Sequence, residues 1–104
     1  MSASDAAKLW KEHIGMRILD VRKSAEYNAG HLASAENMPL EYLNDHLSDL
    51  DKGQTYYVHC AGGYRSMIFI SILRNYGYYN LINIAGGYDA IKKLQDPLIE
   101  TATA

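Results

Sequence analysis

Cysteine is almost absent from this chain of 104 residues, in which Cys60 stands alone. A single cysteine excludes an intramolecular disulfide and a zinc site built from several cysteines, and it fits a reducing compartment, the cytoplasm. The histidines are not spaced to place two imidazoles on one helix face: they are His13, His31, His46 and His59. No metal site is therefore expected.

Long apolar runs and clusters of one charge are missing too. No stretch approaches the roughly 18 to 20 apolar residues of a membrane span, and residues 1–10 lack a basic segment followed by an apolar one, so we expect neither a membrane partner nor a secretion signal. Ten basic and twelve acidic side chains give a formal net charge of −2 with no basic cluster, which argues against a nucleic-acid partner. With two prolines, 48% hydrophobic and 21% charged residues, the composition is that of one globular domain.

Apolar periodicity and turn residues predict an alternation of helices and strands. Helices are expected at 2–14, 24–28, 41–50, 64–76 and 88–95, and strands at 16–21, 35–38, 55–60 and 80–84. Ser2 and Asp5 resemble a capping box, and Gly15 is positioned to end the first helix. Strands separated by such helices indicate an α/β fold, a mainly parallel sheet with helices on both faces. We expect a single domain over residues 1–104, with 97–104 as a frayed tail.

Cys60 stands where such a fold places its ligand site, after the carboxyl end of a predicted central strand. Ala61, Gly62 and Gly63 follow, and glycines permit positive φ angles, while Arg65 lies in the first turn of the next helix. Backbone N–H groups of residues 61–65 can then converge on the sulfur as an anion nest, which lowers a thiol pKa. The alternative is that Cys60 is an inert buried residue. Adjacent glycines and a helix-opening arginine with no evident packing purpose favour a nucleophile.

Several motifs resemble, in order and spacing, those of rhodanese-type domains, a family of small α/β sulfurtransferases. The resemblance to the family's first signature lies in residues 19–22 (Leu-Asp-Val-Arg), 26–27, 30–31 and 37–39. Residues 60–65 correspond to its active-site loop and residues 86–87 to its second glycine signature. The loop form His-Cys-Ala-Gly-Gly-Tyr-Arg-Ser further resembles domains found behind metallo-β-lactamase-like persulfide dioxygenase domains in some bacterial proteins. The chain opens directly on its first helix, which fits excision from a longer protein or a divergent single-domain member.

The resemblance implies a mechanism without metal or organic cofactor. The Cys60 thiolate would take a sulfane sulfur from thiosulfate or a low-molecular-weight persulfide, and a thiol or cyanide would accept it. Arg65 would offer a cation to anionic substrate groups, and Tyr64 would wall the substrate mouth. The loop residues that would bind the donor are uncharged, unlike the basic loops of many members that favour thiosulfate: Ala61, Gly62, Gly63 and Tyr64. This departure argues against thiosulfate as the natural donor. The expected partners are a small sulfur donor, a thiol acceptor and a fused or interacting sulfur-metabolism domain.

Three charged residues are candidate supports of this loop. Asp20 and Arg22 lie two apart on a strand, so they share a face near its carboxyl end. Under the resemblance Asp20 would accept hydrogen bonds from the loop region, and Arg22 would pair with Glu26. The alternative is an exposed pair of charges with little energetic value. His59 directly precedes the cysteine on its strand, points to the other face and is interpreted as structural.

Two other classes of function remain open. His59-Cys60 and Arg65-Ser66 resemble the cysteine phosphatase signature, which has five residues between cysteine and arginine, whereas this chain has four. A shorter loop makes a smaller cradle, better suited to one sulfur atom than to a phosphate. The second alternative is a non-catalytic protein-binding module, which a missing cysteine or a disrupted loop would favour. Both features are intact here.

Overall fold

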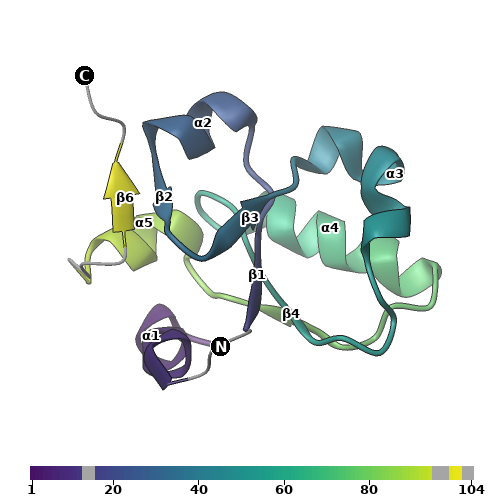
Figure 1. The fold of residues 1–104 in the computed structure, drawn as a ribbon, viewed down its shortest axis with the longest axis horizontal. Helices are drawn as coiled ribbons and strands as arrows, with labels where there is room; N and C mark the ends of the chain where they lie inside the picture. Colours follow the sequence, from purple (N-terminus) through teal and green to yellow (C-terminus); the bar gives the residue numbers. More distant parts are fainter. Residues whose placement is uncertain (13–15, 95–98, 102–104) are drawn as a thin grey trace.

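The computed structural model describes residues 1–12, 16–94 and 99–101 (Figure 1). At its centre is a parallel sheet in the order β3-β1-β4-β5, formed by β1 (Arg17–Asp20), β3 (Ala35–Asn37), β4 (Tyr56–His59) and β5 (Leu81–Asn83). Asp20, the last residue of β1, lies opposite Asn37 of β3 and His59 of β4. These strands therefore end at one edge of the sheet, and Cys60 follows β4 at that edge.

Helices cover both faces of the sheet, as predicted from the alternation of elements. They are α1 (Ala3–Glu12), α2 (Ser24–Ala29), α3 (Leu43–His46), α4 (Tyr64–Asn75) and α5 (Gly87–Lys92), with 3-10 turns η1 (Leu40–Tyr42) and η2 (Leu47–Asp49) on either side of α3. In Figure 1, α3 and α4 lie on one side of the sheet, and α1 and α5 on the other. The α/β fold class is confirmed.

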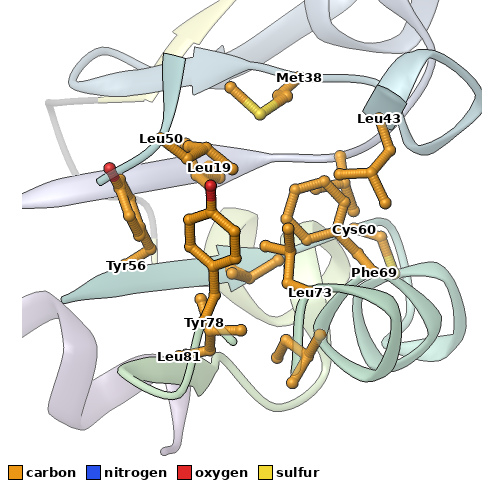
Figure 2. Packing of buried hydrophobic residues seen from close by; sticks show 13 residues of the cluster. Leu19, Met38, Leu43, Leu50, Tyr56, Cys60, Phe69, Leu73, Tyr78 and Leu81 are labelled. Atoms are coloured by element: carbon orange, nitrogen blue, oxygen red, sulfur yellow. The ribbon is translucent and has the colours of Figure 1, made fainter. Parts of the chain in front are cut away.

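Each face has its own hydrophobic core, because successive side chains of a strand point to opposite faces. On β1, Leu19 packs with Phe69 and Leu73 of α4 on one face (Figure 2), whereas Ile18 packs with Trp10 of α1 and Ile91 of α5 on the other. Burial of these side chains on both faces holds the sheet rigid, and so positions the strand ends that carry polar residues.

Two expected elements differ in the structure, and a third can be compared only at its start. The tail interpretation of residues 97–104 is wrong for Ile99–Thr101, which forms β6 and pairs antiparallel with β2 (Gly30–Leu32); 97–98 and 102–104 lie outside the described residues. The continuous helix expected at 41–50 is broken into η1, α3 and η2, since its asparagine, aspartates and serine are weak helix formers. At the first helix, Ser2 Oγ accepts a hydrogen bond from the Asp5 amide at 3.1 Å, which confirms the cap, whereas the expected end at Gly15 falls outside the described residues.

None of the helices in the described part of the chain is both long enough and apolar enough to cross a bilayer.

Candidate active site

The Cys60 sulfur lies in a loop between the end of β4 and the first turn of α4. The Gly63 amide donates a hydrogen bond to Cys60 Sγ at 3.0 Å. Gly63 has φ +116°, in the left-handed region, and a Cβ there would meet nothing within 4 Å. Glycine is therefore required at residue 63 by its backbone angle, not by lack of space, and that angle aims the amide at the sulfur.

Hydrogen bonds favour the ionised form of this sulfur. Cys60 is buried, with 1% of its surface exposed, and burial alone raises the pKa of its thiol. The amide and hydroxyl of Ser66, together with the amides of Gly63 and Arg65, outweigh that cost and lower the pKa of Cys60 below its ordinary value. A thiol in such a cradle can act as a nucleophile near neutral pH.

The first turn of α5 is hydrogen-bonded to the backbone of the loop that begins at Cys60. The Tyr88 amide donates to the carbonyl of Cys60 at 2.7 Å, and the Asp89 amide donates to that of Ala61 at 3.0 Å. Gly87 has φ +56°, and a Cβ there would collide with the Cys60 carbonyl oxygen and lie 2.7 Å from that of Ala61. The second glycine signature thus allows the start of α5 to approach the backbone of the cysteine itself.

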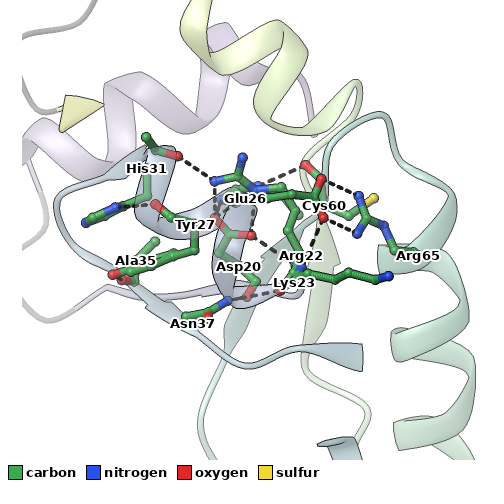
Figure 3. Close-up of polar contacts among 12 residues, drawn as sticks. Asp20, Arg22, Lys23, Glu26, Tyr27, His31, Ala35, Asn37, Cys60 and Arg65 are labelled. Atoms are coloured by element: carbon green, nitrogen blue, oxygen red, sulfur yellow. Dashed lines mark hydrogen bonds and ion pairs between the residues drawn. The ribbon is translucent and has the colours of Figure 1, made fainter. Parts of the chain in front are cut away.

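Arg65 does not offer a free cation, because Glu26 of α2 neutralises it. Its Nη1 and Nη2 donate to Glu26 Oε1 at 2.6 Å and Oε2 at 3.0 Å (Figure 3). This pair of hydrogen bonds lowers the pKa of Glu26 to about 2. The expected pair between Arg22 and Glu26 is therefore wrong: Arg65 occupies both oxygens of Glu26, and Arg22 pairs instead with Asp20, the last residue of β1.

Asp20 and Arg22 form a buried ion pair, so the alternative of an exposed pair is wrong. Arg22 Nε and Nη2 donate to Asp20 at 2.9 and 2.7 Å, and Nη2 also donates to the Gly30 carbonyl at 2.7 Å. Asp20 is 0% and Arg22 4% exposed. The expected hydrogen bonds from the loop to Asp20 are absent: among the described residues, none of residues 60–65 donates a hydrogen bond to the Asp20 carboxylate. The pair instead supports the loop through Tyr88, whose ring lies 4.1 Å from the Arg22 guanidinium.

Neither the His59 nor the Tyr64 side chain forms a hydrogen bond with the Cys60 sulfur. His59 is fully buried; its Nδ1 lies 3.2 Å from the Cys60 carbonyl and its Nε2 lies 3.9 Å from Asp20. Burial lowers the pKa of His59, which keeps the ring neutral and suits a structural role. The Tyr64 side chain is exposed at the start of α4, so its contact with substrate stays a prediction. Gly62 and Ala61 complete the loop.

Two residues near the sulfur were not among the sequence candidates for the site. Ser66 is fully buried with its Oγ 3.7 Å from Cys60 Sγ, and Asn83 of β5 lies 2.6 Å from that hydroxyl. Ser66 carries a signal that could have been used, a hydroxyl in the first turn of the helix after the loop. Asn83 carries none, because its place depends on the register of β5 against β4. Within the described residues no three histidine, cysteine or carboxylate side chains cluster as metal ligands.

Residues 3–94 match the family model of the rhodanese-like domain. This chain belongs to the rhodanese-like family. A crystal structure of a rhodanese-like domain protein from Staphylococcus aureus has a TM-score of 0.86 with this chain at 27% identity, and the match covers 99% of this chain and 97% of that one.

Relatives of this rhodanese-like chain include proteins named as sulfurtransferases. A tRNA sulfurtransferase of Thermoplasma acidophilum is 38% identical over 66 residues, which are 61% of this chain and 13% of that protein. A sulfurtransferase of Allochromatium vinosum is 26% identical over 82 residues, 79% of this chain and 77% of that protein. The chain spans between 21% and 57% of the length of further curated relatives, so much of each lies outside the shared region.

Proposed function

We propose that this chain is a sulfurtransferase that carries a sulfane sulfur on Cys60 as a persulfide. The observation that carries the proposal is the convergence of the Gly63 amide and the Ser66 hydroxyl and amide on Cys60 Sγ, which lowers the pKa of the thiol. Backbone donors of this kind stabilise an anionic sulfur without requiring a particular substrate group. Membership of the rhodanese-like family and relatives named as sulfurtransferases support the same chemistry.

The transfer proceeds in two displacements at sulfur. The Cys60 thiolate attacks the outer sulfur of the donor, a new S–S bond forms, and the donor's own S–S bond breaks with its electron pair leaving on the donor thiolate, or on sulfite when thiosulfate is the donor. A thiol or cyanide then attacks the outer sulfur of the Cys60 persulfide and departs as a new persulfide or as thiocyanate, which restores the Cys60 thiolate. No external oxidant or reductant is consumed, and the cradle faces an anion at both stages.

The charge balance at the loop favours a persulfide donor over thiosulfate. Arg65 is paired with both oxygens of Glu26, and the loop itself contains no charged residue between Cys60 and Arg65. A compact dianion therefore meets little uncompensated positive charge beside the sulfur. The loop's resemblance to domains that follow persulfide dioxygenase domains supports the same class of donor. It also favours such a sulfur-metabolism domain as a fused or interacting neighbour of this chain. The single cysteine fits the reducing cytoplasm as its compartment.

Thiocyanate formation from glutathione persulfide and cyanide tests the proposal. The Cys60→Ser variant should retain its circular dichroism spectrum and lose transfer by about a hundredfold or more, since a hydroxyl is far too weakly acidic to replace the thiolate. Equal turnover by this variant would overturn the mechanism. An unmodified chain inert toward every sulfane donor would favour the protein-binding module. Hydrolysis of an aryl phosphate at a rate comparable to sulfur transfer would favour the phosphatase.

A further inference from the structure

The Ser66 hydroxyl links the catalytic sulfur to a side chain on another strand. Ser66 Oγ lies 3.7 Å from Cys60 Sγ, 3.1 Å from the Gly63 carbonyl oxygen and 2.6 Å from Asn83 Oδ1. The hydroxyl thus has three hydrogen-bonding neighbours, two of which are oxygens that can only accept. Because Ser66 is fully buried, water does not make up for a missing partner.

Ionisation of Cys60 reverses the demands on this hydroxyl. In the thiol state Sγ–H donates to Ser66 Oγ, and the Ser66 proton is donated to Asn83 Oδ1 or to the Gly63 carbonyl. In the thiolate state the sulfur accepts only, so the Ser66 proton turns to it. Ser66 Oγ then needs a donor, and Asn83 Oδ1 cannot be one. A half-turn of the Asn83 amide brings Nδ2 to the hydroxyl and completes the chain Asn83 to Ser66 to thiolate.

We propose that Asn83 is a positioning residue for the Cys60 thiolate, acting through Ser66 by reversal of its side-chain amide. The inference rests on the proposed function only in taking Cys60 as the nucleophile. No described residue hydrogen-bonds Asn83 Nδ2 in the thiol state, so the reversal breaks no hydrogen bond from this nitrogen to the described residues. In the thiol state Ser66 needs an acceptor for its proton, and the Gly63 carbonyl can take the place of Asn83 Oδ1. In the thiolate state Ser66 Oγ needs a donor, and among the described residues no other donor lies beside it to take the place of Asn83 Nδ2. Asn83 therefore stabilises the thiolate more than the thiol.

Charged groups around the loop do not share this role. The elements around Ser66 and Asn83 carry the following charged or titratable side chains: Arg65 of α4, Glu26 of α2, Asp20 at the end of β1, Arg22 just after it, His59 of β4 and Asp89 of α5. In the part of the chain that is described, none of them hydrogen-bonds the side chain of Ser66 or Asn83. The ammonium of Met1 donates to the main-chain carbonyl of Asn83 at 3.0 Å, a contact that side-chain substitution leaves in place.

The pH dependence of Cys60 alkylation by iodoacetamide tests the inference. Asn83→Leu is similar in size, carries no charge and cannot donate, so it should raise the midpoint of alkylation by about half a pH unit. Asn83→Asp retains only acceptors near neutral pH and should raise the midpoint by about one unit or more. Asn80→Asp, an exposed site three residues earlier in the chain, is the matched control and should shift the midpoint by less than about 0.3 unit.

A double-mutant cycle with Ser66→Ala separates the hydrogen-bond chain from simple charge effects. If Asn83 acts through Ser66, the shift caused by Asn83→Leu should fall to less than about half of its value when Ser66 is alanine. The same shift in both backgrounds, or no shift with leucine in the presence of Ser66, would overturn the inference. Should one Asn83 variant fail to fold, the other completes the cycle. Alkylation needs no sulfur donor, so a chain that shows the coupling but transfers no sulfur would refute the proposed function and leave Asn83 standing.

Discussion

Under the proposed function, removing the charge of Glu26 should shift the donor preference of this chain toward thiosulfate. In the Glu26→Gln variant one amide oxygen still accepts a hydrogen bond from Arg65, but the guanidinium is no longer neutralised. The released charge lies beside the loop that receives the donor. A donor that carries two negative charges close to the transferred sulfur should gain most from it.

The size of the effect follows from Coulomb's law in a wet site. The Arg65 and Glu26 side chains are 28% and 36% exposed, so the interaction is strongly screened. A unit charge about 6 Å from a dianion, at the dielectric constant of water, gains about 1.4 kcal/mol, which is about tenfold in kcat/KM. Glutathione persulfide carries at most one negative charge on its outer sulfur and holds its carboxylates further away, so it gains about half as much, and its kcat/KM should change by no more than about threefold.

The assay is the ratio of kcat/KM for thiosulfate to that for glutathione persulfide, with cyanide as acceptor at about 0.01 M salt, where the Debye length of about 30 Å leaves the interaction nearly unscreened by ions. A ratio cancels any general effect of the substitution on the thiolate. Glu36→Gln is the matched control: Glu36 pairs with Arg17 at 2.7 Å, and Arg17 starts β1 at the end of the sheet remote from Cys60. This variant makes the same change in net charge and should leave the ratio unchanged. An unchanged ratio in Glu26→Gln would refute the argument that the neutralised arginine disfavours thiosulfate.

Three further outcomes are expected. Gly87→Ala should slow alkylation of Cys60 and lower the free energy of unfolding in urea by about 2 kcal/mol, because the added Cβ collides with the Cys60 carbonyl in a left-handed backbone conformation. Asp20→Ala should lower the free energy of unfolding by about 3–5 kcal/mol, since it leaves Arg22 buried without a counter-charge. The unmodified chain should show half-maximal alkylation of Cys60 below the ordinary thiol pKa of about 8.5, because a lowered pKa means that the thiolate persists to lower pH. A free energy of unfolding within about 0.5 kcal/mol of that of the unmodified chain for Gly87→Ala or Asp20→Ala would contradict these expectations. An alkylation midpoint above about 8.5 for the unmodified chain would do the same.

The sheet and the loop were predictable because their signals are local. The buried strands β1 and β4 are short apolar runs, and Gly62 and Gly63 mark the turn after Cys60. The sequence predicted a sulfur within reach of backbone amides, and the structure brings the Gly63 amide to 3.0 Å from it. It did not predict β2 and β6, since three-residue strands far apart in the chain leave no periodic signal.

Pairing among charged side chains was less predictable than the fold. From the sequence, Arg22 was expected to pair with Glu26 and Arg65 to meet the substrate, and only the arrangement of α2 and α4 in space decides that Glu26 joins Arg65. Burial of the Asp20–Arg22 pair likewise depends on Tyr88, which arrives from α5. Asn83 reaches the site through the parallel register in which it lies opposite Val58 of β4. Such contacts arise from tertiary packing, which spacing along one strand or helix does not encode.

The most direct test of the central claim follows one labelled sulfur atom through Cys60. The chain is mixed with one equivalent of glutathione persulfide whose outer sulfur carries a heavy isotope, desalted, and divided between peptide mass spectrometry and treatment with cyanide. We expect one labelled sulfur per chain on the peptide that contains Cys60, and one labelled thiocyanate per loaded chain with recovery of the free thiol. Labelled thiocyanate formed while the Cys60 peptide stays unmodified, or label bound to the chain elsewhere than Cys60, would contradict this expectation.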